Sequence, residues 1–293
     1  MPVLFRGVGQ TFRVGISSQG KLQSAFFVGS FIVGFGGGGL FERLGSKRTA
    51  VASLLLLGLG AFTLCLSPAL WVLLVGGVLF GIGNAWLTVI YSTIIALQSG
   101  KHRQRVFTWA LLFMALGGTV GPVLLGFALN KTSTWRTPVF SMGVLFVLAI
   151  LFLRQARVPA LDLVEKRKEI HNLPFWGILQ RKRLWLIGFL FILHALGGGV
   201  LVSWIGRLYE LRCGIGVERA ALLLSVNAGG FFAGRFALGA WFGDRLPDRV
   251  LLALCATGAT VVSTFLLLGN SYIMAVVLMG VEGFLMSGDA PSI

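Results

Sequence analysis

Charged side chains are scarce in this chain of 293 residues. Only 12% of its residues are Asp, Glu, Lys or Arg, whereas a soluble domain carries about 25%. Hydrophobic residues make up 56%, and the mean hydropathy is +0.87. A soluble protein of this size cannot hide so much apolar surface, because its outside must stay polar. The composition therefore argues against a soluble enzyme, a disordered chain and a DNA-binding domain, and it favours a protein that lies in lipid.

Acidic residues are the scarcer of the two charged classes. The chain has 10 Asp and Glu against 25 Lys and Arg, which gives a net charge of +15. In a soluble protein this excess would suggest a nucleic-acid partner. Here the basic residues form short clusters between long apolar runs, which is the pattern of loops beside anionic lipid headgroups. We therefore expect contact with the lipid bilayer and no nucleic-acid partner.

The sequence also lacks the patterns of catalytic and metal sites. Its three cysteines, Cys65, Cys213 and Cys255, are too far apart to form a metal or redox motif. It has no His-x-x-x-His pair, no nucleophile elbow and no phosphate-binding Gly-Lys-Ser or Gly-Lys-Thr run. We expect no enzyme activity, no metal and no cofactor, and the missing nucleotide loop disfavours transport driven by ATP. The first residues also do not form a cleavable signal peptide.

What the sequence does contain is a series of long apolar segments. A membrane-spanning helix needs about 20 apolar residues, and nine segments approach that length. They lack the alternation of barrel strands, so the predicted fold is an all-α polytopic membrane protein. The nine spans are Leu22–Phe41, Ala50–Leu66, Leu70–Leu97, Val106–Leu129, Pro138–Leu153, Leu184–Gly206, Ala220–Phe242, Val250–Leu268 and Tyr272–Gly288.

The connections between these spans alternate between strongly and weakly basic. One set carries 16 Lys and Arg and the other carries 8, and the more basic set is expected on the cytoplasmic side. The N-terminus is then outside the cell. The outer set comprises Arg6, Arg13, Lys21, Lys131, Arg136, Arg207, Arg212 and Arg219.

The longest polar stretch, residues 154–183, divides the chain into two parts. Residues 1–153 form a predicted N-terminal helical bundle of five spans, and residues 184–293 form a predicted C-terminal bundle of four. We interpret residues 154–183 as a cytoplasmic linker. It is either a helix at the membrane surface or a disordered charged segment.

Two short cytoplasmic loops resemble each other. Each places an acid followed by arginine at the end of one span, as Glu42-Arg43 and as Asp244-Arg245, and the two acids are 202 residues apart. This spacing indicates two related halves rather than a short repeat. An acid in such a turn can pair with arginine and with a helix N-terminus, and so latch one conformation. The alternative is that these charges only anchor the loops at the membrane surface.

These motifs resemble the major facilitator superfamily of secondary transporters. The superfamily's signature between helices 2 and 3 is matched at Gly38, Leu40, Arg43, Gly45 and Lys47, with Glu42 in place of Asp and Ser46 in place of a basic residue. The second loop keeps Asp244, Arg245 and Arg249, with Pro247 in place of glycine. A third match, to the packing motif of helix 5, comprises Gly117, Gly121, Pro122 and Gly126.

The resemblance implies a two-bundle fold with a central site and alternating access for a small organic solute. The nine spans would be helices 2–10 of twelve, and residues 12–20 would form the outer loop that follows helix 1. On this count the N-terminal bundle lacks helix 1 and the C-terminal bundle is incomplete. The alternative is therefore a truncated, non-transporting membrane protein or a receptor-like fragment. The family's buried arginine in helix 4 has no counterpart near Gly77, which disfavours the proton route of drug antiporters.

Polar residues inside the spans are the candidate substrate and coupling sites, because they are costly in lipid. Glu282 and His194 lie near the midplane of their spans. Glu282 either binds a proton or a substrate group, or is a carboxyl packed between helices. His194 is either a pH-sensitive ligand or a neutral side chain bonded to a backbone carbonyl. The coupling ion would be a proton or sodium.

Arginine and amide side chains give two indications of the substrate. Arg235 either meets an anion, pairs with an acid such as Glu282, or extends to the cytoplasmic side. Asn84, Tyr91 and Gln98 are spaced by seven and share a helix face, which either lines the cavity or bonds to another helix; Asn227 is similar. As indications of the substrate, Arg235 favours an organic anion, and the polar stripe of Asn84, Tyr91 and Gln98 favours a sugar-like solute. We expect a multi-pass protein of the inner or plasma membrane.

Overall fold

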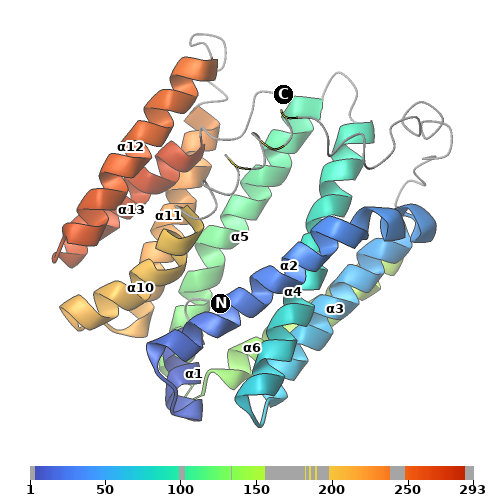
Figure 1. Cartoon of the computed structure of the whole chain (residues 1–293), viewed down its shortest axis with the longest axis horizontal. Coiled ribbons are helices and arrows are strands. Elements are labelled where there is room, and N and C mark those ends of the chain that lie inside the picture. The colour runs from blue at the N-terminus through green and yellow to red at the C-terminus, as the bar shows by residue number, and fades with distance from the viewer. Residues whose placement is uncertain are drawn as a thin grey trace. The chain divides into compact units, whose positions relative to one another are not determined.

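The computed structural model describes residues 4–98, 103–132, 134–155, 182, 185, 189, 198–237 and 248–287. All regular structure in these ranges is helical (Figure 1), which confirms the predicted fold class. The helices are α1 (Phe5–Phe12), α2 (Ile16–Leu44), α3 (Ser46–Leu66), α4 (Leu70–Gln98), α5 (Arg103–Lys131), α6 (Arg136–Gln155), α10 (Val200–Cys213), α11 (Val217–Ala237), α12 (Asp248–Leu268) and α13 (Tyr272–Met286).

Five of the described helices are long and apolar enough to cross a membrane. Their apolar stretches are Ser46–Leu66, Leu70–Ile95, Trp109–Lys131, Arg136–Gln155 and Val217–Ala237. Shorter apolar helices cover Ala253–Leu268 and Tyr272–Met286. These seven correspond to predicted spans, and the predicted span Leu22–Phe41 lies within α2. Most of the predicted span Leu184–Gly206 and the linker from residue 156 onward lie outside the described residues.

The expected outer loop at residues 12–20 is wrong. The break between α1 and α2 covers only residues 13–15, and α2 already begins at Ile16. Arg13 ends α1 in the left-handed conformation, with φ 52°, and its N–H donates to the Gly9 carbonyl. The amides of Ser18 and Gln19 donate to the Gly15 carbonyl and close the first turn of α2. Polar residues here extend a helix beyond its apolar part, so a hydropathy boundary does not mark its start.

The helices group into two compact units. Unit 1 comprises Met1–Gln23, Gln98–Phe140 and Val202–Ile293, and unit 2 comprises Ser24–Leu97 and Ser141–Leu201. The chain of α2 and of α6 therefore passes from one unit to the other. The predicted division into bundles at residues 153 and 184 stays a prediction.

In unit 2, α4 contacts α2 backbone to backbone. A Cβ added at Gly29 would collide with the Val78 carbonyl, and one added at Gly81 would collide with the Phe26 carbonyl. The Ser30 hydroxyl, next to Gly29, donates to the Gly81 carbonyl at 3.2 Å. Only glycine allows two helix backbones to come this close, which is how helices associate in lipid.

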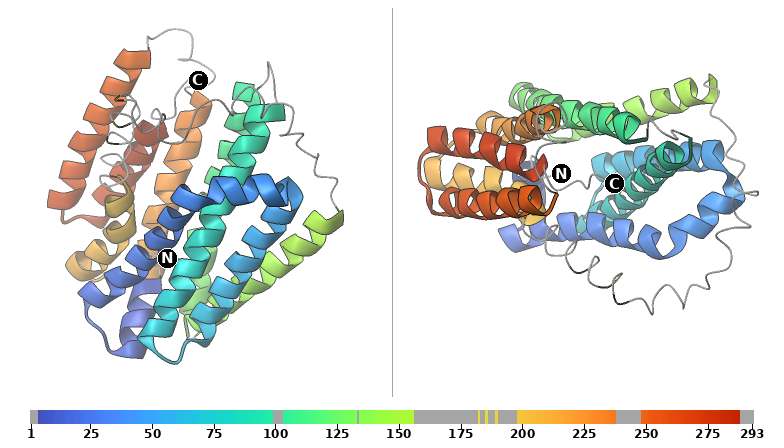
Figure 2. Two further views of the ribbon diagram at one scale, coloured as in Figure 1. Left: turned by 45° about the vertical axis from the view of Figure 1, so that its right-hand side comes forward. Right: turned by 90° about the horizontal axis from the view of Figure 1, so that it is seen from above.

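In unit 1, α13 contacts α11 in the same way. On another face, α11 packs beside α5, as both views of Figure 2 show. A Cβ at Gly230 would collide with the Gly280 carbonyl, and one at Gly283 would collide with the Asn227 carbonyl. The Asn227 side chain Nδ2 donates to the Met279 carbonyl at 3.2 Å. Each unit therefore contains a glycine crossing that is reinforced by a polar side chain.

The two crossings match residue by residue. Gly29 and Val78 in the first correspond to Gly230 and Gly280 in the second, and Gly81 with Phe26 corresponds to Gly283 with Asn227. Every pair is separated by 201 or 202 positions in the sequence, the same spacing as the acids of the two similar loops. The repeat therefore extends from a loop motif to the contacts that hold the helices together.

Replacing a crossing glycine by alanine should destabilise the protein, because the added methyl group meets a backbone that cannot move aside. We expect Gly81→Ala and Gly283→Ala each to lower the free energy of unfolding by about 1–3 kcal/mol. Gly117→Ala is the matched control, because no atom of the described residues lies within 4 Å of a Cβ at Gly117, and helix propensity should make it neutral or stabilising. Thermal unfolding in detergent measures all three. Equal effects at the three positions would contradict the crossing.

Candidate functional site

The most deeply buried acid in the described residues is Glu282 on α13. Its side chain is fully buried. The Ser263 hydroxyl on α12 donates to Glu282 Oε1 at 3.1 Å. Burying a carboxyl in an apolar helix pair is costly, and the hydrogen bond offsets part of that cost. Sequence reasoning named Glu282 but missed Ser263, although a serine in the apolar span preceding an intramembrane acid is a usable signal.

The rotation of α13 is fixed by its contact with α11. Gly283 contacts α11 at Asn227, so the preceding residue, Glu282, is turned toward α12. Leu285 on α13 packs beside Gly258 of α12, 3.0 Å from a Cβ built there. The glycine crossing therefore determines which helix receives the carboxyl group.

The sequence repeat identifies the residues of the first half that are equivalent to Glu282 and Ser263. At a spacing of 202 residues, Glu282 corresponds to Phe80 and Ser263 to Ala61. The Phe80 ring packs against the rings of Phe26 and Phe146, with centroids 6.2 Å and 5.8 Å away. The halves share a backbone arrangement, but a carboxyl and a hydroxyl in the second half replace a phenyl ring and a methyl group in the first.

Asn227 and Arg235 both lie on α11 and are half-buried. The Asn227 amide is engaged with α13 through the Met279 carbonyl. The Arg235 guanidinium lies 5.3 Å from the centre of the Phe231 ring, a cation–π contact that lowers the cost of a charge in an apolar helix. At 1.5 Å per residue, Arg235 is about 12 Å along the axis from Asn227. Pairing of Arg235 with Glu282 stays a prediction.

The polar stripe of α4 lies away from that helix's two packed faces. Gly81 faces α2, and Gly83 faces α3, where a Cβ would meet the Ser53 carbonyl at 2.7 Å. Asn84 is exposed and Tyr91 is half-buried. Gln98 is the last residue of α4, and its side chain is not described. His194 lies outside the described residues.

The predicted latch loop between α2 and α3 is a single residue, Gly45. It has φ 76° and ψ 164°, a combination that is nearly restricted to glycine. The Lys47 ammonium donates to the Arg154 carbonyl in the last turn of α6 at 2.9 Å, which is where a cation stabilises a helix C-terminus. Gly38, Glu42 and Arg43 lie in α2 and Arg249 in α12, but their side-chain contacts are not described. Asp244 and Arg245 lie outside the described residues.

The helix-5 motif is used unevenly in the contact between α5 and α11. A Cβ at Gly126 would lie 2.8 Å from Ala221, and one at Gly118 would lie 3.2 Å from Ala228. Within the described part of the chain, nothing lies within 4 Å of a Cβ at Gly117 or Gly121. Pro122 lies inside α5. The family motif includes Gly117 and not Gly118, so the contact of Gly118 was not predicted. Gly118 and Gly126 are eight residues apart, which places these two glycines on one face of α5.

A comparison with known protein families gives a match over nearly the whole chain. The family model described as the Major Facilitator Superfamily matches residues 1–292. The chain belongs to the major facilitator superfamily. Members of this superfamily are integral membrane proteins, in agreement with the five apolar helices long enough to span a membrane.

Two curated relatives match parts of this superfamily member. Solute carrier family 2, facilitated glucose transporter member 12, of Mus musculus is 27% identical over 139 residues, which are 46% of this chain and 22% of that protein. The class B tetracycline resistance protein of Escherichia coli is 34% identical over 114 residues, or 39% of this chain and 28% of that protein. The matches thus span less than a third of either relative's length.

A solved structure shares the fold over most of the chain. The crystal structure of a D-xylose-proton symporter superposes with a TM-score of 0.68 and 15% sequence identity, covering 97% of this chain and 75% of that one. At this identity the likeness establishes the superfamily fold and not the substrate.

Substitution of Gly45 tests the single-residue turn. In Gly45→Ala the alanine must adopt a conformation that costs about 1–3 kcal/mol, and we expect the free energy of unfolding to fall by that amount. Gly34→Ala in α2 is the control, because an added Cβ at Gly34 meets no atom of the described residues within 4 Å. Denaturation in detergent measures both variants. A Gly45→Ala protein as stable as the control would show that the turn does not need glycine.

Proposed function

We propose that this chain acts as a secondary transporter, moving a small sugar-like solute across the inner or plasma membrane by alternating access. The observation that carries the proposal is the repeated crossing, α2 with α4 and α11 with α13, at a spacing of 201 or 202 residues. Alternating access by rocking of two halves needs two similar bundles that each stay rigid. A backbone-to-backbone crossing supplies that rigidity, because packed glycine contacts cannot slide without a clash.

The relatives favour a sugar over the organic anion as the substrate class. One is named as a facilitated glucose transporter and the fold neighbour as a D-xylose-proton symporter. Hydroxyl groups of a sugar suit the exposed amide of Asn84 and the phenol of Tyr91. The tetracycline resistance relative has the higher identity over its match, so efflux of a drug is the second candidate, although Gly77 stands where that family's antiporters carry an arginine.

We assign the coupling proton to Glu282. A buried carboxyl that shares a hydrogen bond with Ser263 can hold a proton in one conformation and release it when the other conformation admits water. This role differs from packing alone, in which the carboxyl would keep one protonation state throughout. The first half has Phe80 at the equivalent place, so the assigned proton site occurs once in the repeat.

Glu282→Gln should uncouple transport from the proton gradient. In proteoliposomes, we expect an inward proton gradient to drive accumulation of labelled xylose or glucose by the unaltered chain. Glu282→Gln should lower this accumulation at least about tenfold, because the amide cannot carry the proton. The variant should still exchange solute across the membrane. Glu218→Gln is the matched control, because Glu218 is exposed and its carboxylate accepts a hydrogen bond from Asn130 Nδ2 at 3.1 Å.

Three outcomes contradict the proposal. Equal behaviour of the Glu282→Gln and Glu218→Gln variants would remove Glu282 from coupling. Gradient-driven tetracycline movement without sugar uptake would favour the drug-efflux candidate. No movement of any solute by a folded chain would favour the non-transporting alternative.

Ser263→Ala separates a coupling role from a packing role. Loss of a hydrogen bond to a buried carboxyl costs about 1–3 kcal/mol of stability, so we expect a lower unfolding temperature in either case. If Glu282 carries the proton, the pH dependence of solute uptake also shifts. An unchanged pH profile in a less stable variant would indicate packing alone.

A further inference from the structure

A second polar site lies in unit 1, away from the helix crossings. It is an open cavity of about 490 Å³, within the range of about 300–1,000 Å³ that is typical of small-molecule sites. The cavity lies between α1, the start of α2, the end of α10 and the connection to α11. Its lining residues are Arg6, Gly9, Gln10, Val14, Gln19, Arg207, Glu210, Gly214 and Ile215.

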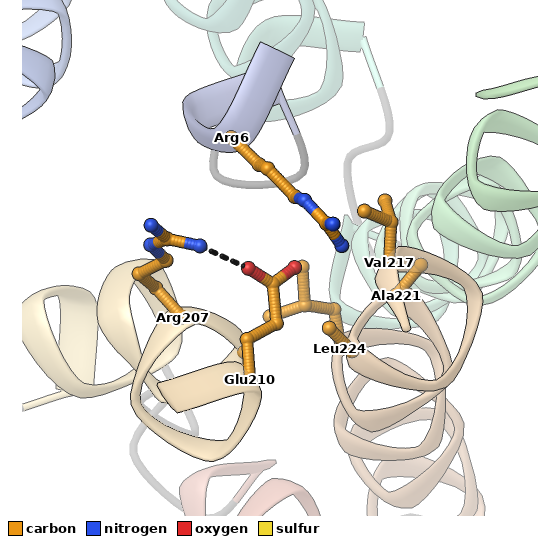
Figure 3. Close-up of a pocket in the computed structure, with 8 residues that line it drawn as sticks. Arg6, Arg207, Glu210, Val217, Ala221 and Leu224 are labelled. Atoms are coloured by element: carbon orange, nitrogen blue, oxygen red, sulfur yellow. Dashed lines mark hydrogen bonds and ion pairs between the residues drawn. The ribbon is translucent and has the colours of Figure 1, made fainter. Parts of the chain in front are cut away.

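The charges around this cavity leave an excess of one positive charge. Arg207 Nη1 donates to Glu210 Oε2 at 2.6 Å, and the two side chains are only 20% and 10% exposed. This pair is neutral as a whole. Arg6 reaches from α1 toward the space between Glu210 and Val217 (Figure 3). Its charge is not neutralised by an acid among the lining residues, so the cavity favours an anion.

Two buried polar atoms in the lining have no hydrogen-bond partner in the described part of the chain. Gln19 is only 4% exposed, and its Oε1 accepts nothing, while its Nε2 makes one long bond of 3.4 Å to the Val14 carbonyl. Arg207 Nε is the second such atom. Buried polar groups are nearly always satisfied. Both atoms lie just beneath the cavity surface, so a ligand with a hydroxyl donor and an anionic acceptor could satisfy them once the Gln19 and Arg207 side chains rotate slightly toward the cavity.

The parts of the cavity are held in place by contacts within unit 1. Trp135 Nε1 donates to Thr11 Oγ1 at 2.8 Å, and the Trp135 ring packs on Gly7, which fixes α1 against the connection between α5 and α6. The Gln19 amide lies over Gly9, where a Cβ would collide with it. Tyr209 on α10 donates to the Leu266 carbonyl at 3.0 Å. Such support keeps the polar groups ready for a ligand.

We propose that this cavity binds a small hydroxylated organic acid of the sugar-acid class. The carboxylate lies between the guanidinium of Arg6 and the Nε of Arg207, which supply charge-assisted hydrogen bonds. A hydroxyl group of the same molecule donates to Gln19 Oε1. From the sequence, Arg6 and Arg207 were predicted only as basic residues on the outer side of the membrane. The proposal concerns equilibrium binding and stands whether or not the chain transports a sugar.

Binding of gluconate to the purified chain in detergent, measured by calorimetry, tests the site. We expect saturable binding of gluconate that is at least about tenfold stronger than binding of glucose, because glucose lacks the charged group. Arg6→Gln should weaken gluconate binding about tenfold or more. Arg13→Gln removes the same charge from the end of the same helix. Arg6 and Arg13 are both exposed, but only Arg6 lines the cavity, so Arg13→Gln should change binding less than about twofold because its charge is farther from the ligand and is screened. Equal weakening by both variants, or equal binding of glucose and gluconate, would overturn the proposal.

Gln19→Leu distinguishes a role of Gln19 in ligand binding from a role in stability, because the two can be measured separately. It removes an acceptor that has no partner in the described residues and one long hydrogen bond from Nε2 to the Val14 carbonyl, so stability should change little. Gluconate binding should nevertheless fall about tenfold, because the hydroxyl loses its acceptor. Undiminished binding in a stable Gln19→Leu protein would contradict the assignment. A protein that binds gluconate but takes up no sugar would contradict the proposed transport function and would still support this binding site.

Discussion

Two helix backbones approach each other at a glycine in each half of the protein, and this contact determines how the helices of that pair are placed. In lipid there is no hydrophobic force that drives one apolar helix against another, so close packing and hydrogen bonds must supply the association. Gly81 and Gly283 bring α4 to α2 and α13 to α11 closely enough that no side chain fits between them. Ser30 and Asn227 place polar groups at the same two crossings and bond across them. Each crossing therefore sets both the spacing and the rotation of its helix pair.

That rotation determines where the buried chemistry lies. With Gly283 facing α11, Glu282 meets Ser263 on α12. The first half keeps the crossing but has Phe80 and Ala61 at the corresponding positions. A duplicated scaffold has thus retained its backbone contacts in both halves while the polar pair occurs in one. This asymmetry is why we assign the proton to the second half.

Much of the fold could be predicted from the sequence, because membrane helices are set by hydropathy and the superfamily by its loop motif. The spacing of Glu42 and Asp244 also indicated the repeat that the crossings display. Hydropathy failed at Ile16, where α2 begins in polar sequence. The choice between Gly117 and Gly118 depends on which face of α5 meets α11, and the cavity at Arg6 joins residues about 200 positions apart. The packed face of α5 and the position of the cavity therefore cannot be predicted from the spacing of residues within one segment.

We expect each glycine-crossed helix pair to move as one body while the two halves move relative to each other. Distances between spin labels test it most directly, with labels at exposed Leu222, Ile273 and Trp71 in a variant whose three native cysteines are replaced. We predict that the distance between labels on α11 and α13, at Leu222 and Ile273, stays the same when xylose is added. The distance between labels on α4 and α13, at Trp71 and Ile273, should shift between two populations. A fixed distance between Trp71 and Ile273 would show that the halves do not move relative to each other, and a changing distance between Leu222 and Ile273 would show that α11 and α13 do not move as one body.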